Sequence, residues 1–126
     1  MPLVRVALRR GKSDDYKKAI GDGVYRAMIE VFNVPNEDRF VVVSEHSASE
    51  FQFSKTYLDI ARSDDLVIIQ ITANNTRTVE QKQALFAGIA GILSVNPGLR
   101  TEDVFINLID VPKENWSFGN GIAQYA

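Results

Sequence analysis

The sequence contains no cysteine and only one histidine among its 126 residues. The lack of cysteine excludes disulfide bonds, a thiolate nucleophile and a cysteine-ligated metal, and a single histidine argues against a histidine-based metal site. No apolar run approaches the roughly 20 residues of a membrane-spanning helix. The N-terminus also lacks the apolar segment and cleavage site of a signal peptide. We therefore expect a soluble, cytoplasmic protein.

The chain also lacks a strong excess of charge of either sign. It has 14 basic and 16 acidic side chains, so its formal net charge is −2. Such a balance gives no electrostatic footprint for nucleic acid or for an anionic membrane. We expect neither as a partner. The length suits one domain with a modest hydrophobic core.

The residue after the initiator methionine is Pro2, and the strand-like run Leu3–Leu8 follows it. If Met1 is removed, the chain begins with a secondary amine, which can accept a proton, donate one or add to a carbonyl group. An internal proline nitrogen can do none of these. The alternative is that Pro2 only protects the terminus from degradation, so a catalytic interpretation depends on what surrounds it.

Two segments of the chain resemble each other. Glu37–Phe40 and Glu102–Phe105 each contain Glu-Asp and open a strand-like run, and a long helical pattern precedes each of them. This repeat predicts two βαβ units, at about residues 2–45 and 65–110, followed by a C-terminal tail. The predicted fold class is α/β (α+β), with a four-stranded sheet and two helices on one face. One domain is expected to span residues 1–126.

Helices are predicted at Asp14–Phe32 and Val79–Val95, where apolar residues recur every three or four positions. Ser13 is a typical N-cap for the first helix, and Thr78 with Gln81 fits a capping box for the second. The four strand-like runs are Leu3–Leu8, Phe40–Val43, Leu66–Ile71 and Val104–Leu108.

The runs Phe40–Val43 and Leu66–Ile71 are almost continuously apolar, which predicts a sheet that is buried on both faces. Two helices can cover only one face of a four-stranded sheet. A second copy of the chain is the simplest cover for the other face, so we expect an oligomer. The alternative is that the central loop at residues 44–64 or the C-terminal tail covers it.

Two segments carry side chains that suit ligand binding. Arg77 follows the third strand, near the edge where ligands tend to bind in parallel sheets, and an arginine can hold a carboxylate with two hydrogen bonds. The alternative for Arg77 is a solvated loop residue. Trp116 and Phe118, in a glycine-containing tail, can wall a pocket, fill the core, or do both. His46 is either an acid or base near neutral pH or a strand-end residue with a structural hydrogen bond.

Several motifs resemble the tautomerase superfamily, whose subunits are paired βαβ units that begin with proline after methionine removal. Pro2–Val4 opens a strand, Gly11–Asp14 resembles the family's Gly-Arg-Ser-Asp junction, and Trp116–Gly121 resembles its aromatic and glycine segment. Val34–Arg39 and Ser44–His46 are similar to malonate semialdehyde decarboxylases in particular. The resemblance covers nearly the whole chain and implies a homotrimer.

The resemblance also implies roles for individual residues. Pro2 would be the catalytic amine, and Asp38 would act on water or help to set the charge of that amine. Arg77 would bind the substrate carboxylate. Trp116 and Phe118 would form walls of the pocket.

Two positions depart from the family pattern. Asn75 stands where the decarboxylases have the first arginine of an Arg-Pro-Arg motif, and Lys12 stands where tautomerases have a substrate-binding arginine. Lysine is a point charge without the fork of an arginine, so it is an imperfect substitute. Asp38 has a second interpretation as well. Asp103 occupies the same place in the second repeat, where no catalysis is expected, so both aspartates can be turn residues.

The expected chemistry depends on the charge of Pro2. An apolar pocket lowers the pKa of its amine and makes it a base, whereas a nearby carboxylate raises that pKa and keeps it cationic. A neutral amine suits proton transfer between the enol and keto forms of a small 2-oxo acid. A cationic amine suits decarboxylation or hydration of the malonate semialdehyde type. Neither reaction needs a metal or an organic cofactor.

Three hypotheses follow from the sequence. A tautomerase that uses Pro2 is the leading one, and a decarboxylase or hydratase is the second. The third is a non-catalytic oligomer that binds a small acid or a partner protein.

Overall fold

The computed structural model describes residues 2–126, so the predicted removal of Met1 lies outside the described residues. The regular elements in chain order are β1 (Leu3–Arg9), α1 (Asp14–Phe32), β2 (Val41–His46), β3 (Val67–Asn74), α2 (Val79–Val95) and β4 (Val104–Val111). Short 3₁₀ turns lie at Ala48–Glu50, Tyr57–Asp59, Thr101–Asp103 and Lys113–Asn115.

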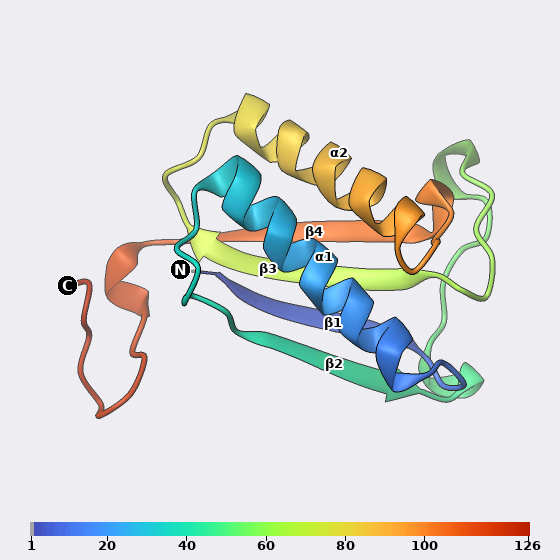
Figure 1. The fold of residues 1–126 in the computed structure, drawn as a ribbon, viewed down its shortest axis with the longest axis horizontal. Coiled ribbons are helices and arrows are strands. Elements are labelled where there is room, and N and C mark those ends of the chain that lie inside the picture. The colour runs from blue at the N-terminus through green and yellow to red at the C-terminus, as the bar shows by residue number, and fades with distance from the viewer. Residues whose placement is uncertain (1) are drawn as a thin grey trace.

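The four strands form one sheet in the order β2-β1-β3-β4, and both helices pack on the same face of it (Figure 1). β1 pairs in parallel with β2, and β3 pairs in parallel with β4. The two central strands, β1 and β3, run antiparallel. The predicted fold class, with two βαβ units in one mixed sheet, is confirmed.

Both helices have the bounds that the sequence predicts, because each start carries a strong cap. The Ser13 hydroxyl accepts a hydrogen bond from the backbone N–H of Tyr16 at 3.1 Å. Thr78 and Gln81 form a complete capping box, each side chain accepting from the backbone N–H of the other residue. Among residues 2–126, neither helix combines the length and the apolar character that a membrane crossing requires.

The strands are longer than the hydrophobic runs indicate. The interpretation of Ser44–His46 as loop is wrong, because these polar residues continue β2 and pair with Ala7–Arg9 of β1. β3 extends through Asn74 and β4 through Val111 for the same reason, since the two strands pair along their full lengths. Backbone pairing with a neighbouring strand therefore overrides the low strand propensity of these polar residues.

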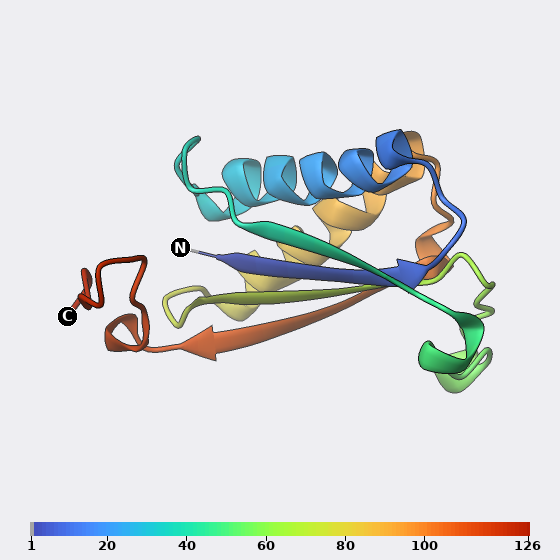
Figure 2. The same cartoon turned by 90° about the horizontal axis from the view of Figure 1, so that it is seen from below.

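One face of the sheet packs on the helices and the other lies open. Figure 2 shows both helices on the same side, with the C-terminal tail and the central loop at opposite ends of the sheet. Within one chain only the helix face of the sheet is covered, as the sequence predicts: in β3, Val67 and Ile69 are buried but Gln70 is exposed. Apolar side chains that remain 41% to 48% exposed around the open face are Phe40, Val42, Phe105 and Ile109.

Candidate active site

The strand pairings bring four separate segments of the chain to one end of the sheet. Leu3 at the start of β1 pairs with Thr72 near the end of β3, because the two strands are antiparallel. Parallel pairing places the start of β2 at the same end, where the N–H of Val4 donates to the carbonyl of Phe40 at 2.9 Å. The end of β4 arrives there too, so the tail after residue 111 begins beside the start of β1.

Pro2 is buried at this end and lines a cavity of ≈ 260 Å³. Most of the wall is apolar: its lining residues are Pro2, Leu3, Phe40, Trp116, Ser117 and Phe118. The rings of Trp116 and Phe118 are stacked with centroids 5.3 Å apart, and Phe40 lies 6.5 Å from Phe118. An amine in such surroundings is poorly solvated, which favours its neutral form.

Asp38 and Arg77 are two charged groups at this end of the sheet. Asp38 is only 4% exposed. Burial raises the pKa of the Asp38 carboxyl, while the positive charge of Arg77 acts in the opposite direction. Asp38 and Arg77 therefore lie within electrostatic reach of each other.

Arg77 is held in place by the C-terminal end of α1. Its Nη2 donates a hydrogen bond to the carbonyl of Phe32 at 3.0 Å, and its Cζ lies 4.6 Å from the centroid of the Phe32 ring. Burial lowers the pKa of the Arg77 guanidinium, while Asp110 and Asp38 raise it. One of its five N–H groups is thus used to orient the side chain, and the remaining fork can bind an anion. The solvated-loop interpretation of Arg77 does not fit this partly buried position.

Three residues at this end were not singled out by the sequence. Asn74 is 8% exposed, and its Oδ1 accepts a hydrogen bond from the indole N–H of Trp116 at 2.8 Å. Tyr125 packs edge-on against Phe118, with centroids 5.1 Å apart. Burial and the charge of Asp38 raise the pKa of the Tyr125 phenol. Phe40 is the third of these residues. Its place in the internal repeat, directly before a strand, was the only feature of the sequence that distinguished it.

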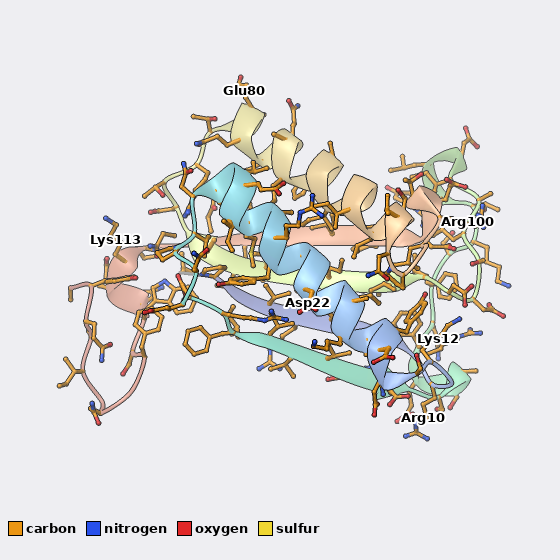
Figure 3. All side chains as sticks on the ribbon, viewed as in Figure 1. Arg10, Lys12, Asp22, Glu80, Arg100 and Lys113 are labelled. Atoms are coloured by element: carbon orange, nitrogen blue, oxygen red, sulfur yellow. The ribbon has the colours of Figure 1, made fainter. Side chains whose placement is uncertain are left out.

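Two of the predicted binding residues are placed differently. Asn75 lies at the site end and is fixed through its backbone N–H, which donates to the carbonyl of Val111 at 3.0 Å. Lys12 lies at the opposite end of the sheet from Lys113, which begins the tail (Figure 3). The Lys12 ammonium forms an ion pair with Asp65 at 2.7 Å, and its hydrogen bond to that carboxylate raises the pKa of Lys12. Within one chain, Lys12 is therefore not part of the Pro2 site.

Asp103 and His46 also lie at that opposite end. Asp103 is completely buried and accepts hydrogen bonds from the Ser63 N–H at 2.7 Å and from the Ser63 hydroxyl at 2.6 Å. Asp103 thus anchors a loop, whereas Asp38 lies beside the Pro2 end. His46 ends β2 and stacks on Phe51 at 6.0 Å, which favours its structural interpretation.

The described residues 2–126 contain no group of three or more His, Cys, Asp or Glu side chains placed to hold a metal ion. The titratable groups gathered at the Pro2 end are instead Asp38, Arg77 and Tyr125. What the arrangement offers is an amine position in an apolar cavity, a buried carboxyl and an oriented guanidinium. These groups suit proton transfer on a small carboxylate.

Comparison with known proteins gives consistent matches. Two family models, both described as "Tautomerase enzyme", match residues 38–119 and residues 2–59. The chain is 42% identical over 98% of its length to "Probable tautomerase YusQ" of Bacillus subtilis (strain 168), of which it covers 98%.

Solved structures of two malonate semialdehyde decarboxylases are also similar. One is 31% identical with a TM-score of 0.91, and the match covers 98% of this chain and 95% of that one. The other, inhibited by 3-bromopropiolate, is 36% identical with a TM-score of 0.91, covering 98% of this chain and 93% of that one.

Proposed function

The chain belongs to the tautomerase family, and we propose that it is a cofactor-independent tautomerase whose base is the amine of Pro2, freed by removal of Met1. The proposed substrate is the enol form of a small 2-oxo acid. The observation that carries this proposal is the burial of Pro2 in an apolar cavity, with Asp38 and Arg77 at the same end of the sheet.

The proposed reaction moves one proton and shifts one double bond. Arg77 holds the substrate carboxylate through the N–H groups that Phe32 does not use. The neutral Pro2 amine removes the proton of the enol hydroxyl, the oxygen becomes a carbonyl, and the same proton is returned to the adjacent carbon. Trp116 and Phe118 limit the access of water to the amine, which keeps the pKa of the amine low enough for it to act as a base.

Decarboxylation is the second candidate, and the position of Asp38 favours it. Asp38 lies at the same end of the sheet as Pro2, and an ionised carboxylate close to the Pro2 amine would raise the pKa of that amine and keep it cationic. A cationic Pro2 would polarise the aldehyde oxygen of malonate semialdehyde while the carboxylate leaves as carbon dioxide. The similar decarboxylase structures support this candidate. Asn75 weighs against it, because an amide binds the departing carboxylate less strongly than an arginine does.

The open face of the sheet supports an oligomer, and we propose the homotrimer that the family resemblance implies. Its half-exposed apolar side chains, Phe40 and Phe105 among them, are a surface that a second copy can bury. Lys12 joins the Pro2 site only if another copy brings it there, since it lies at the far end of its own sheet.

A proton NMR time course with two substrates separates these possibilities. Protein whose intact mass confirms the loss of Met1 is given phenylenolpyruvate, a stable enol of a 2-oxo acid, or malonate semialdehyde, with a Pro2→Ala variant as the control. Accelerated ketonisation that is lost in the variant supports the tautomerase. Acetaldehyde formation that is lost in the variant establishes the decarboxylase instead. Failure of both assays leaves only the non-catalytic binder.

A further inference from the structure

The chain has a second cavity at the end of the sheet opposite Pro2. Its volume is ≈ 250 Å³, close to that of the Pro2 cavity. Residues that line it are Phe53, Tyr57, Arg62, Leu66, Ile68 and Phe105. They come from the central loop, from the β3 region and from the start of β4; none of them takes part in the proposed reaction at Pro2, and Phe105 alone also belongs to the open face proposed to meet a second copy.

This second cavity follows from the internal repeat. In each βαβ unit the paired strands are offset by 37 residues, since Val4 pairs with Val41 and Val67 pairs with Val104. The starts of α1 and α2 are 65 residues apart. Because β1 and β3 are antiparallel, this repeat is a rotation that exchanges the two ends of the sheet.

The walls of the two cavities correspond under that 65-residue shift. Phe40 of the Pro2 cavity corresponds to Phe105, and Phe118 corresponds to Phe53. The ring pair of Trp116 and Phe118 has its counterpart in Phe51 and Phe53, whose centroids are 5.8 Å apart. Phe51 itself does not line the second cavity, so the shared aromatic wall consists of Phe105 and Phe53, the counterparts of Phe40 and Phe118.

The shift also shows what the second cavity lacks. It carries Pro2 to Val67, whose nitrogen is a peptide amide inside β3 and cannot act as a base. It carries Asp38 to Asp103, whose carboxylate is committed to Ser63. The second cavity thus keeps the walls of the site without its reactive groups.

Positive charge remains beside this apolar cavity. Arg62 is anchored through Nη1 alone, which donates to the carbonyls of Ser54, Tyr57 and Ile60 at 3.0 to 3.4 Å. The rest of its guanidinium makes no other hydrogen bond among residues 2–126 and is available to an anion. Arg9 also lies close, with its Cζ 5.5 Å from the centroid of the Phe53 ring, but its Nη1 already forms an ion pair with Asp64 at 3.0 Å, so Arg62 is the cation proposed to bind the anion.

We propose that this second cavity is a binding site, without catalysis, for a small carboxylate that carries a ring or a branched apolar group. The apolar part occupies the wall formed by Phe53, Leu66 and Phe105, and the carboxylate binds the Arg62 guanidinium. The cavity has room for one such molecule. Because the site has no amine, its occupant is released unchanged, and binding does not depend on any reaction at Pro2.

Each cavity contains one leucine, which allows the two sites to be observed separately. Leu3 lines the Pro2 cavity and Leu66 lines the second. The full-length protein, with labelled leucine methyl groups and in its native oligomeric state, is titrated with benzoate. We expect a saturable shift of the Leu66 methyl signals. Arg62→Gln should weaken this binding about tenfold, the effect of losing a hydrogen bond to a charged partner, and leave the Leu3 titration unchanged.

A matched pair of variants provides the control. Phe105→Ala should weaken the Leu66 response only, and the repeat-related Phe40→Ala should weaken the Leu3 response only. Both side chains are about half exposed, so neither change should unfold the chain. Leu66 signals that stay fixed at benzoate concentrations that saturate Leu3 would overturn the proposal. A Leu66 response equally insensitive to Arg62→Gln and Phe105→Ala would also overturn it.

Discussion

Asp38 and Asp103 occupy equivalent places in the two repeats, and variants of the two test whether one is catalytic and the other structural. Asp103 is fully buried and accepts two short hydrogen bonds from Ser63. Hydrogen bonds to a charged group contribute about 1.5 to 3 kcal/mol each. Asp103→Ala should therefore lower the free energy of unfolding by about 3 to 6 kcal/mol. For a chain of this length, that loss lowers the melting temperature by about 10 °C or more.

Asp38→Ala should behave in the opposite way. Burial disfavours the ionised Asp38 carboxylate in the folded state, so its removal should lower the free energy of unfolding by less than the removal of Asp103 does. For the decarboxylation candidate, its loss should instead lower kcat/KM about a hundredfold, because the Pro2 amine loses the carboxylate that keeps it cationic and able to act as an acid. Asp103→Ala should retain kcat/KM wherever it is folded.

Thermal denaturation followed by circular dichroism, at one protein concentration for all variants, measures the first quantity, and acetaldehyde formation from malonate semialdehyde measures the second. The common concentration is needed because oligomerisation shifts the melting temperature. The reasoning is refuted if both variants lose similar stability and the folded Asp38→Ala protein keeps full activity, because Asp38 would then be a turn residue like Asp103.

Three further outcomes are expected from the same site. Arg77→Lys keeps the charge but loses the fork and the contact with Phe32, so kcat/KM should fall about tenfold or more, mostly through KM in steady-state assays. Trp116→Phe removes the donor to the buried Asn74 oxygen and should cost about 1 to 3 kcal/mol of stability by chemical denaturation. For the decarboxylation candidate, which requires an ionised Asp38, the raised pKa of Asp38 predicts an acid limb of the kcat/KM profile for malonate semialdehyde above pH 3.9, the ordinary value for aspartate, and Asp38→Asn should abolish that limb. With respect to stability, ionisation of Asp38 is unfavourable in the fold, so Asp38→Asn should gain relative stability as pH rises through the raised pKa.

Local signals in the sequence determined the helices well. The side chains of Ser13 and Thr78 accept hydrogen bonds from backbone N–H groups in the first helical turn and so determine where each helix begins. The predicted bounds of α1 and α2 therefore agree with the structure. Strand ends were harder to predict. Ser44–His46 has the composition of a loop, and only its pairing with Ala7–Arg9 makes it strand. That pairing is a contact between distant segments, which composition cannot reveal.

The candidate site was predictable where position in a βαβ unit determines it. The sequence places Pro2 before the first strand and Arg77 after the third. That these two positions lie at the same end of the sheet depends on the antiparallel pairing of β1 and β3, which the sequence did not specify. Lys12 follows the end of β1, so it lies at the end of the sheet opposite Pro2. The contact of Trp116 with Asn74 and that of Tyr125 with Phe118 arise when the tail folds back, and no local pattern predicts where a tail will pack.

The most direct test of the central proposal compares two preparations that differ only at the first residue. One is processed protein that begins at Pro2, and the other retains Met1 because methionine aminopeptidase was inhibited during expression; intact mass confirms each. The account predicts that the processed protein accelerates ketonisation of phenylenolpyruvate and that the Met1-retaining protein does not, because its Pro2 nitrogen is an amide. Equal rates in the two preparations would contradict the assignment of Pro2 as the reacting group.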